Sequence, residues 1–382
     1  MTRRVRPLPV ILGVVLGLAA AAVVLPMLDG RGGPPGLHAG PLLSDCDGRL
    51  RDLVIHHVPE SADITAGVYD GLLRHLPADV TVHVVCADAA AFDDLAGRAG
   101  TVQCTLAPVV VGHPITTWSR DRWLALESAQ PGGPTVLLAP RGEDGADAWP
   151  ERRGDERVAA DLAAALGRSV TAARSDLYFD GGDFVADNET VFVTPAVLRR
   201  NLQRTVETRE ELIEHLSAAL GRRVVLLDEA PDHHAGMFMM PVGDRTVLVG
   251  DPAAGLRLMD PEGDGAADAL LPPEGADTSA ETQRRFDAVA RQCHEEGYRV
   301  VRIPMAPGRD GRTYLTHVNV ILDGRDGRRV VTMPVFRGAD ALNDAAERTW
   351  RNLGWEVRRV DCTACYPHFG SLRCLVNVLR RG

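Results

Sequence analysis

His215-Leu-Ser-Ala-Ala-Leu-Gly221, followed directly by Arg-Arg-Val-Val-Leu-Leu, is the stretch of this 382-residue sequence that decides its fold class. Its first part has the apolar spacing of an amphipathic helix. Gly221 suits the left-handed residue that ends a helix, and the β-branched run after it predicts a strand. The same order recurs at three other places, each leading into a strand: Asp161–Gly167, Cys293–Gly297 and Thr349–Gly354.

An earlier and less regular unit predicts a helix over Ala62–Leu76 and a strand over Val80–Cys86. Each helix and strand is followed by further strand-like runs. These are Leu177–Phe179, Thr190–Val193, Met237–Met240, Arg245–Val249, Val318–Leu322, Arg329–Met333 and Leu375–Leu379. About five copies of one helix-and-strand module predict an α/β propeller or array. Ala253–Pro273, rich in Gly, Asp and Pro, is expected to be a surface loop.

The N-terminus differs from the rest of the chain. Three arginines within residues 1–6 precede an uncharged apolar run over Pro7–Leu28. This order predicts a signal anchor or signal peptide over 1–28, and we favour an uncleaved anchor because no small-residue cleavage site follows the run. Residues 29–44 are expected to form a flexible linker, and 45–382 a single catalytic domain. The protein is therefore predicted to be membrane-anchored and facing outside the cytoplasm, or secreted.

Composition limits the classes of partner. The hydrophobic fraction is 45%, which allows a sizeable core. The net charge is −10, and all 42 basic residues are arginines. An acidic chain without a basic stripe is a poor binder of nucleic acid, whereas its negative field favours small cationic substrates.

Seven cysteines follow the apolar run. In an exported protein an odd number predicts a few disulfides and one free thiol, and a Cys362–Cys365 bond or a bond from either to a distant cysteine is the preferred interpretation. The alternative is a structural zinc site made by Cys362, Cys365, His368 and Cys374, whose residue types suit that metal.

Four stretches carry the side chains that could do chemistry, and each falls at an equivalent point of a successive module, at the end of a strand. They are Thr117–Trp123, Phe179–Phe184, Asp232–Met237 and the turn His368–Cys374. Together they provide a thiol, imidazoles and several carboxylates. A pseudo-symmetric array would direct them at one central cavity.

This set of residue types suits attack on a planar, cationic carbon. Cys374 would be the nucleophile, with its thiolate favoured by the positive charge of a bound guanidinium. Carboxylates would hold that cation through paired hydrogen bonds, and a histidine would protonate the leaving amine and then activate water. Asp180 is a candidate to orient the histidine or the substrate. Taken alone, Cys374 would more commonly be a buried structural cysteine, so the hypothesis depends on the other stretches.

These stretches resemble the guanidine-modifying, or pentein, superfamily, which includes arginine and agmatine deiminases, dimethylarginine dimethylaminohydrolase and amidinotransferases. The resemblance is carried by Trp118-Ser-Arg-Asp121, Phe179-Asp-Gly-Gly-Asp183, Thr316-His-Val-Asn319 and Gly370-Ser-Leu-Arg-Cys374. It implies a five-fold pseudo-symmetric α/β propeller and places the general acid and base on His234. It also implies that Asp121, Asp183, Arg120 and Trp118 contact the substrate, and that no cofactor or metal is required.

One position departs from that resemblance. Many relatives have His-x-Asp where this chain has His234-Ala-Gly236, and the missing carboxylate bears on which substrate is used. His233 is the alternative imidazole, because the alignment of this stretch with the motif depends on a single residue. The predicted function is a cysteine-dependent hydrolase of the deiminase type, or an amidinotransferase, acting on a guanidino or amidino compound through a covalent amidino-thiol intermediate. The alternatives are a non-catalytic protein that binds a cationic ligand, and a zinc-stabilised protein.

Overall fold

The computed structural model describes residues 39–142, 150–263 and 265–382. The expected anchor over 1–28 and most of the expected linker lie outside these residues. Within the described ranges, no helix is long and apolar enough to cross a membrane. The linker was predicted to extend to residue 44, but β1 (Ala39–Leu42) already pairs with β5 (Leu124–Ser128), so this part of it is a sheet edge.

One arrangement of strands recurs in five of the sheets in the described residues. Two strands pair antiparallel, a helical connection follows, and the next strand adds parallel to the second. In one example β8 (Phe184–Ala186) pairs antiparallel with β9 (Thr190–Val193), α6 (Arg209–Leu220) follows, and β10 (Arg223–Leu226) adds parallel to β9. The α/β class predicted from the sequence is therefore confirmed.

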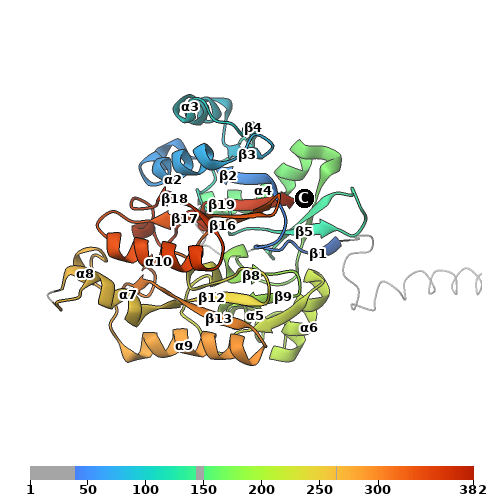
Figure 1. Cartoon of the computed structure of the whole chain (residues 1–382). Helices are drawn as coiled ribbons and strands as arrows, with labels where there is room; N and C mark the ends of the chain where they lie inside the picture. The colour runs from blue at the N-terminus through green and yellow to red at the C-terminus, as the bar shows by residue number, and fades with distance from the viewer. Residues whose placement is uncertain (1–38, 143–149, 264) are drawn as a thin grey trace, which may run out of the picture. The chain divides into compact units, whose positions relative to one another are not determined.

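The other units follow the same order along the chain (Figure 1). The first contains β5, β6 (Thr135–Ala139), α4 (Pro150–Leu166) and β7 (Val170–Arg174). The third contains β11 (Met239–Pro241), β12 (Thr246–Asp251), α9 (Ala280–Glu295) and β13 (Arg299–Pro304). The fourth contains β16 (Ile321–Arg325), β17 (Arg328–Val335), α10 (Asp340–Asn352) and β18 (Glu356–Asp361).

The fifth unit joins segments from the two ends of the described chain. β19 (Val376–Arg381) pairs antiparallel with β2 (Leu50–His56), with Val376 opposite Ile55. The helix α2 (Ala62–His75) then leads to β3 (Thr81–Cys86), which is parallel to β2, and α3 (Ala89–Ala99) leads to β4 (Thr105–Val110). The strand after Cys374 is therefore held by a segment more than 300 residues earlier.

The glycines expected to end the helices do so. Gly167, Gly221, Gly297 and Gly354 all have positive φ angles, of 59°, 59°, 82° and 82°. Gly221 also donates its backbone N–H to Ser217 O, closing the last turn of α6. These conformations are costly for residues with a Cβ, which is why glycine marks the helix–strand boundary in each case.

Some sequence-based boundaries were wrong. Leu177–Phe179 forms no strand, and residues 318–320 precede β16 instead of opening it. The expected loop over 253–273 contains most of α7 (Pro252–Met259) and all of α8 (Ala266–Ala269). The helix α7 forms because Pro252 occupies its first turn and the Asp251 carboxylate accepts the N–H of Ala254. Other short elements include α5 (Pro195–Asn201), β14 (Ala306–Pro307) and β15 (Tyr314–Leu315).

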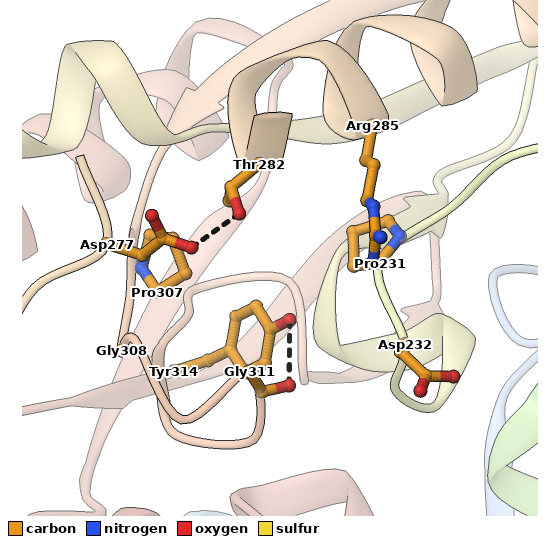
Figure 2. Close-up of a pocket in the computed structure, with 9 residues that line it drawn as sticks. All are labelled: Pro231, Asp232, Asp277, Thr282, Arg285, Pro307, Gly308, Gly311 and Tyr314. Carbon is orange, nitrogen blue, oxygen red and sulfur yellow. Dashed lines mark hydrogen bonds between the residues drawn. The ribbon is translucent and has the colours of Figure 1, made fainter. Parts of the chain in front are cut away.

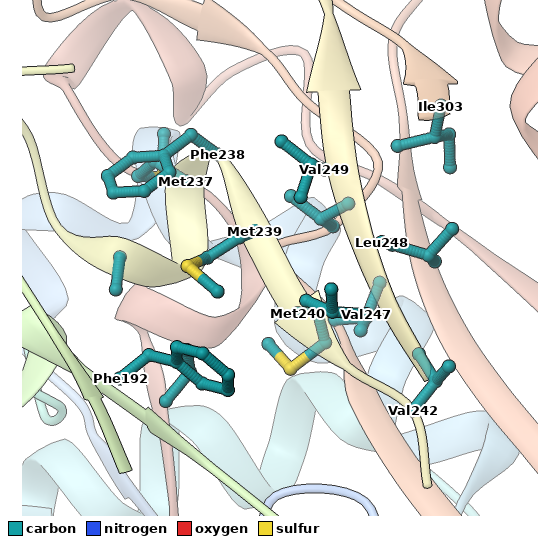
Figure 3. Close-up of a cluster of buried hydrophobic side chains, with 14 of the residues drawn as sticks. Phe192, Met237, Phe238, Met239, Met240, Val242, Val247, Leu248, Val249 and Ile303 are labelled. Carbon is teal, nitrogen blue, oxygen red and sulfur yellow. The ribbon is translucent and has the colours of Figure 1, made fainter. Parts of the chain in front are cut away.

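The hydrophobic core includes strands that are buried on both faces, as in β11 and β12 (Figure 3). Adjacent residues Met239 and Met240 are both fully buried, as are Val247, Leu248 and Val249. Continuous burial of this kind occurs where helices cover one face of a sheet and other elements cover the other. This packing fixes the position of the strands, and the turns that carry the predicted site residues lie at the N-terminal ends of such strands.

All seven cysteines lie in the described residues and all are free thiols, so the predicted disulfides are absent from the structure. Their sulfurs are distributed over different parts of the core, where free cysteine packs as a small hydrophobe. The Cys365 thiol donates to the backbone oxygen of Cys362, at 3.3 Å.

Candidate active site

The polar side chains singled out in the sequence lie on short turns shortly before β5, β8, β11 and β19. Asp180 begins the 3-10 turn Gly181–Asp183 before β8, and His234 begins the turn Ala235–Met237 before β11. Cys374 ends the turn Leu372–Cys374 before β19. Asp121 lies three residues before β5. The predicted positions are thus equivalent between modules, but at the starts of strands rather than at their ends.

These turns border one cavity of about 570 Å³. Its lining includes six of the seven predicted site residues: Trp118, Asp121, Asp180, Asp183, His234 and Cys374. The other residues that line it are Arg152, Ala196, Arg199, Arg200, Asp232, His233, Arg312, His368 and Phe369. Carboxylates, guanidinium groups, imidazoles and the thiol therefore line one space.

The His234 ring lies between two carboxylates. Its Nδ1 is 3.9 Å from Asp121 Oδ1 and its Nε2 is 3.9 Å from Asp180 Oδ2. Burial alone would lower the pKa of His234. The interactions with Asp180 and Cys374 and the negative charge of Asp121 outweigh burial, so the pKa lies well above its usual value. His234 is therefore an imidazolium over a wide pH range and can donate a proton inside the cavity.

The neighbouring His233 has a different environment. Its Nε2 is 3.0 Å from Phe369 O, and its Nδ1 accepts the backbone N–H of His234 at 2.7 Å. Burial and the positive charge of His234 lower its pKa to about 3, so it stays neutral. Both ring nitrogens are used in backbone contacts, which leaves His234 as the imidazole positioned for proton transfer.

Gly182 allows the His234 ring to take this position. A Cβ built on Gly182 would lie 2.4 Å from His234 Nδ1 and 2.5 Å from Cγ, closer than any side chain tolerates. Gly182 is thus required by the close approach of the imidazole, whereas a side chain at Gly181 would collide with the backbone oxygen of Arg120.

Cys374 is buried, with 4% of its surface exposed, at the wall of the cavity. Its Sγ lies 3.6 Å from Asn319 Nδ2 and 3.8 Å from Met237 Sδ. The Asn319 amide also donates to Gly236 O at 3.0 Å and accepts the N–H of Arg373 at 2.8 Å. One buried side chain therefore links the histidine turn, the cysteine turn and the sulfur itself.

Asp180 is surrounded by arginines. Its Oδ1 accepts from Arg152 at 2.6 Å and from Arg122 at 3.2 Å, and its Oδ2 accepts from Arg200 at 2.8 Å. Burial would raise the pKa of Asp180, but its interaction with His234 and the charges of Arg200 and Arg152 hold that pKa well below its usual value. Asp180 is therefore ionised and stabilises the charged form of His234.

Asp183 was expected to hold the substrate, but both of its oxygens have protein partners. Oδ1 accepts from Thr194 Oγ1 at 3.0 Å. Oδ2 accepts the backbone N–H of Asp180 at 2.8 Å and also pairs with Arg200. Its contacts thus fix the turn of Asp180 and the side chain of Arg200.

Asp121 keeps one oxygen available. Its Oδ2 accepts from Arg152 at 3.2 Å, whereas the buried Oδ1, which faces His234, has no hydrogen-bond donor among the described residues. Burial raises the pKa of Asp121, although the charges of His234 and Arg152 oppose this effect. A buried carboxylate oxygen without a donor is costly, so the site favours a ligand that brings an N–H group.

Arg120 was predicted to contact the substrate, and the structure places it elsewhere. Its guanidinium donates to Asn377 Oδ1 at 2.8 Å and to Phe184 O at 3.1 Å, away from the cavity. Burial and the charge of Arg373 lower its pKa to about 9. Its backbone N–H donates to Cys374 O at 3.3 Å, so Arg120 supports the cysteine turn from behind.

The turn of Cys374 is also fixed by a buried ion pair. Arg373 and Asp45, which are 3% and 7% exposed, form a hydrogen-bonded salt bridge. Asp45 Oδ2 additionally accepts the N–H of Ala186 at 2.8 Å. At Gly236, where the resemblance led us to expect an aspartate, a Cβ would lie 3.2 Å from Arg373 Cδ. The space beside Gly236 is therefore occupied by the arginine that precedes the cysteine.

The zinc interpretation does not agree with the structure. No group of three or more His, Cys, Asp or Glu side chains in the described part of the chain has the arrangement to hold a metal. His368 lines the cavity, whereas Cys362 and Cys365 belong to a hydrophobic cluster.

A second, smaller cavity of about 50 Å³ adjoins the first through Asp232 (Figure 2). Asp277 and Tyr314 in its wall already bond to Thr282 Oγ1 and Gly311 O, at 2.5 and 3.4 Å. Its volume suits a few water molecules and not a substrate.

Several cavity residues were not predicted as site residues. Arg200, which lines the cavity, and Asn319, which contacts Cys374, were given no role, although Asn319 lies in the marked stretch Thr316–Asn319. Arg152 and Arg312 lie outside every such stretch, and no local pattern distinguishes them from the other arginines of the chain.

The fold is similar to that of solved agmatine deiminases, which confirms the predicted resemblance at the level of the fold. The chain is similar to the agmatine deiminase of C. jejuni, at 13% identity and a TM-score of 0.64, covering 88% of this chain and 95% of that one. A Cys-to-Ser form of that enzyme with substrate bound gives 12% identity, 88% and 95% coverage and a TM-score of 0.64. The agmatine deiminase of Enterococcus faecalis gives 14% identity, 91% and 97% coverage and a TM-score of 0.62. No protein-family model and no curated protein sequence matches the chain.

Proposed function

We propose that this protein is a cysteine-dependent hydrolase of the deiminase type, or an amidinotransferase, that acts on a guanidino or amidino compound. The observation that carries the proposal is the His234 ring, 3.9 Å from both Asp121 and Asp180, in a cavity that Cys374 also lines. Nucleophile, proton donor and carboxylates for a cation thus border one space. The solved neighbour that holds its substrate in a Cys-to-Ser form supports a cysteine nucleophile.

In the proposed mechanism, Cys374 Sγ attacks the central carbon of the planar cation and forms a C–S bond. His234 protonates the departing nitrogen, the C–N bond breaks, and ammonia or an amine leaves. A cationic amidino-thiol adduct remains on Cys374. His234 then takes a proton from water, the oxygen attacks the same carbon, and the C–S bond breaks to release a ureido product and the thiolate. Attack by an amine instead of water would complete an amidino transfer.

The carboxylates take distinct roles in this proposal. Asp121 accepts N–H groups of the substrate through its unpaired Oδ1, and Asp180 keeps His234 charged. Asp183 positions Asp180 and Arg200, and Trp118 forms a wall of the cavity.

We further propose that the five sheets surround a common pseudo-five-fold axis, as a propeller. The support is their shared strand order and the equivalent positions of Asp121, Asp180, His234, Asn319 and Cys374 ahead of the first strand. An experimentally determined structure that placed the five sheets around no common axis would contradict this. Location outside the cytoplasm is also a proposal, resting on the sequence of 1–28 alone, and cell fractionation tests it.

Covalent labelling tests the nucleophile. Incubation with 2-chloroacetamidine should add one amidine group to Cys374, because the thiolate displaces chloride from a planar, cationic reagent. Cys374→Ser should not be labelled, and excess guanidinium chloride should slow labelling of the wild type. Labelling of Cys374→Ser at the wild-type level would contradict the assignment of Cys374 as the nucleophile.

A screen of guanidino compounds for ammonia and ureido products separates an enzyme from a binding protein. Release of ammonia that depends on Cys374 and His234 supports the hydrolase. Tight binding of a guanidino compound without any product, in the presence of acceptor amines as well, would instead favour the non-catalytic alternative.

A further inference from the structure

One guanidinium group already occupies the carboxylate pair of the cavity, and it belongs to the protein. Arg152 Nη1 donates to Asp121 Oδ2 at 3.2 Å, and Arg152 Nη2 donates to Asp180 Oδ1 at 2.6 Å. The two ends of one planar cation thus contact the two carboxylates that flank His234. Hydrogen bonds from one planar cation to carboxylates are also how a substrate guanidinium would be held in this cavity.

Arg152 differs from the other arginines that contact Asp180. Arg122 is 1% exposed and is also bound by Glu156 at 2.7 Å, so it is part of the buried framework. Arg200 pairs with Asp183, whose side chain is only 2% exposed and would lose its cationic partner without it. Arg152, like Arg200, lines the cavity and is partly exposed, with 23% and 29% of their side chains accessible, but Arg152 contacts Asp121 where Arg200 contacts the buried Asp183.

The position of Arg152 on α4 allows it to leave. It lies near the N-terminal end of α4 (Pro150–Leu166), where its long side chain reaches the cavity from the edge. Glu156, four residues further along the same helix face, is within range of a helical ion pair with a displaced Arg152. Asp180 would keep Arg122 and Arg200 after such a displacement, so it would remain ionised.

We infer that Arg152 is a specificity-determining residue that competes with the substrate for Asp121 and Asp180. A ligand enters the pair only when it binds these two carboxylates more tightly than Arg152 does, so weakly held amidines are rejected. This inference rests on the proposed function, because it assumes that a guanidino or amidino group binds there. When Arg152 is displaced in only a fraction of the molecules, the apparent affinity of the protein for the ligand is reduced to that fraction of its intrinsic value.

The test uses 2-chloroacetamidine as the probe and the full protein. The rate of labelling of Cys374 is measured against reagent concentration, which gives a half-saturating concentration and a limiting rate. Arg152→Leu should lower the half-saturating concentration about tenfold and leave the limiting rate within about twofold. Arg157→Leu is the matched control, since it removes the same charge from an exposed position of α4 and should label as the wild type does.

Arg152→Lys separates the effect of a guanidinium that bridges Asp121 and Asp180 from the effect of its positive charge. Lysine keeps the positive charge but cannot bridge the two carboxylates with a planar fork, so its half-saturating concentration should lie between those of the wild type and Arg152→Leu. The inference would be overturned if both variants at position 152 had the wild-type half-saturating concentration, or if folded Arg152→Leu lost the limiting rate. In either case, labelling of the wild type would still uphold the proposed function. Absence of labelling in all proteins would overturn the proposed function and the inference with it.

Discussion

Replacement of Asn319 by leucine tests whether one buried amide holds the nucleophile in place. Leucine is similar in size but removes three contacts: the bond to Gly236 O at 3.0 Å, the bond from Arg373 N at 2.8 Å, and the 3.6 Å contact with Cys374 Sγ. Gly236 O and Arg373 N would be left buried without that partner. At about 1–3 kcal/mol for each such group, Asn319→Leu should lower the free energy of unfolding by about 2–6 kcal/mol.

The same change should slow the reaction of Cys374. The sulfur would lose the polar group that sets its position, and a misplacement of about 1 Å in a reactive group costs about a hundredfold in rate. We therefore expect labelling by 2-chloroacetamidine to fall about a hundredfold in Asn319→Leu. Stability would be measured by unfolding in urea, because guanidinium chloride would compete for the site.

Asn343→Leu provides the matched control. Asn343 is also buried and bonds to Phe336 O at 2.8 Å and to Phe336 N at 3.1 Å, so its loss should cost a similar free energy of unfolding. It contacts neither Cys374 nor its turn, and labelling should be unchanged. Equal slowing in both variants would show that instability, and not the position of the sulfur, limits labelling. Labelling of Asn319→Leu at the wild-type rate would refute the positioning role.

Three further outcomes follow from contacts of the same cavity. Gly182→Ala should abolish release of ammonia from a guanidino substrate while circular dichroism shows an intact fold, because the added Cβ would displace the His234 ring; wild-type turnover would contradict this. Asp45→Ala should lower the free energy of unfolding in urea by about 3–5 kcal/mol, since it leaves the Arg373 charge buried and unpaired, and a loss below about 1 kcal/mol would show that the pair matters little. The wild type should have a higher free energy of unfolding than His234→Gln, with the full difference at pH values below about 6.5, the ordinary pKa of histidine. The difference should disappear as pH rises through the raised pKa of His234 in the folded state, and a difference that grew with pH would contradict the charge assigned to His234.

The helix-and-strand modules could be predicted because each boundary depends on a local requirement. Gly221, Gly297 and Gly354 occupy left-handed positions that only glycine adopts at little cost, so the sequence marks these helix ends directly. The expected loop over 253–273 was wrong for a related reason. Its many Gly, Pro and Asp residues indicate a loop, but Asp251 and Pro252 are also a helix start, and composition alone does not separate the two.

The site could be predicted only in part, because its geometry depends on contacts between distant modules. Asp121, Asp180, His234 and Cys374 were marked by their motifs, and the structure places all four at one cavity. Arg120 is adjacent to Asp121, but the turn directs it behind the cysteine, which no spacing reveals. Arg152 lies on a helix without any motif, and its role depends on where α4 meets two other modules.

The strand order of the sheets has a consequence for how such a protein can change during evolution. Each of Asp121, Asp180, His234 and Cys374 lies on its own short turn, and a separate sheet anchors each turn, so a substitution in one turn leaves the strands behind the other turns in place. Gly236 illustrates this, since it stands where the sequence resemblance leads one to expect an aspartate, while β11 behind its turn pairs regularly with β12. A duplicated gene could therefore acquire a new substrate by altering one turn at a time, and laboratory libraries restricted to these turns should retain folded members at high frequency.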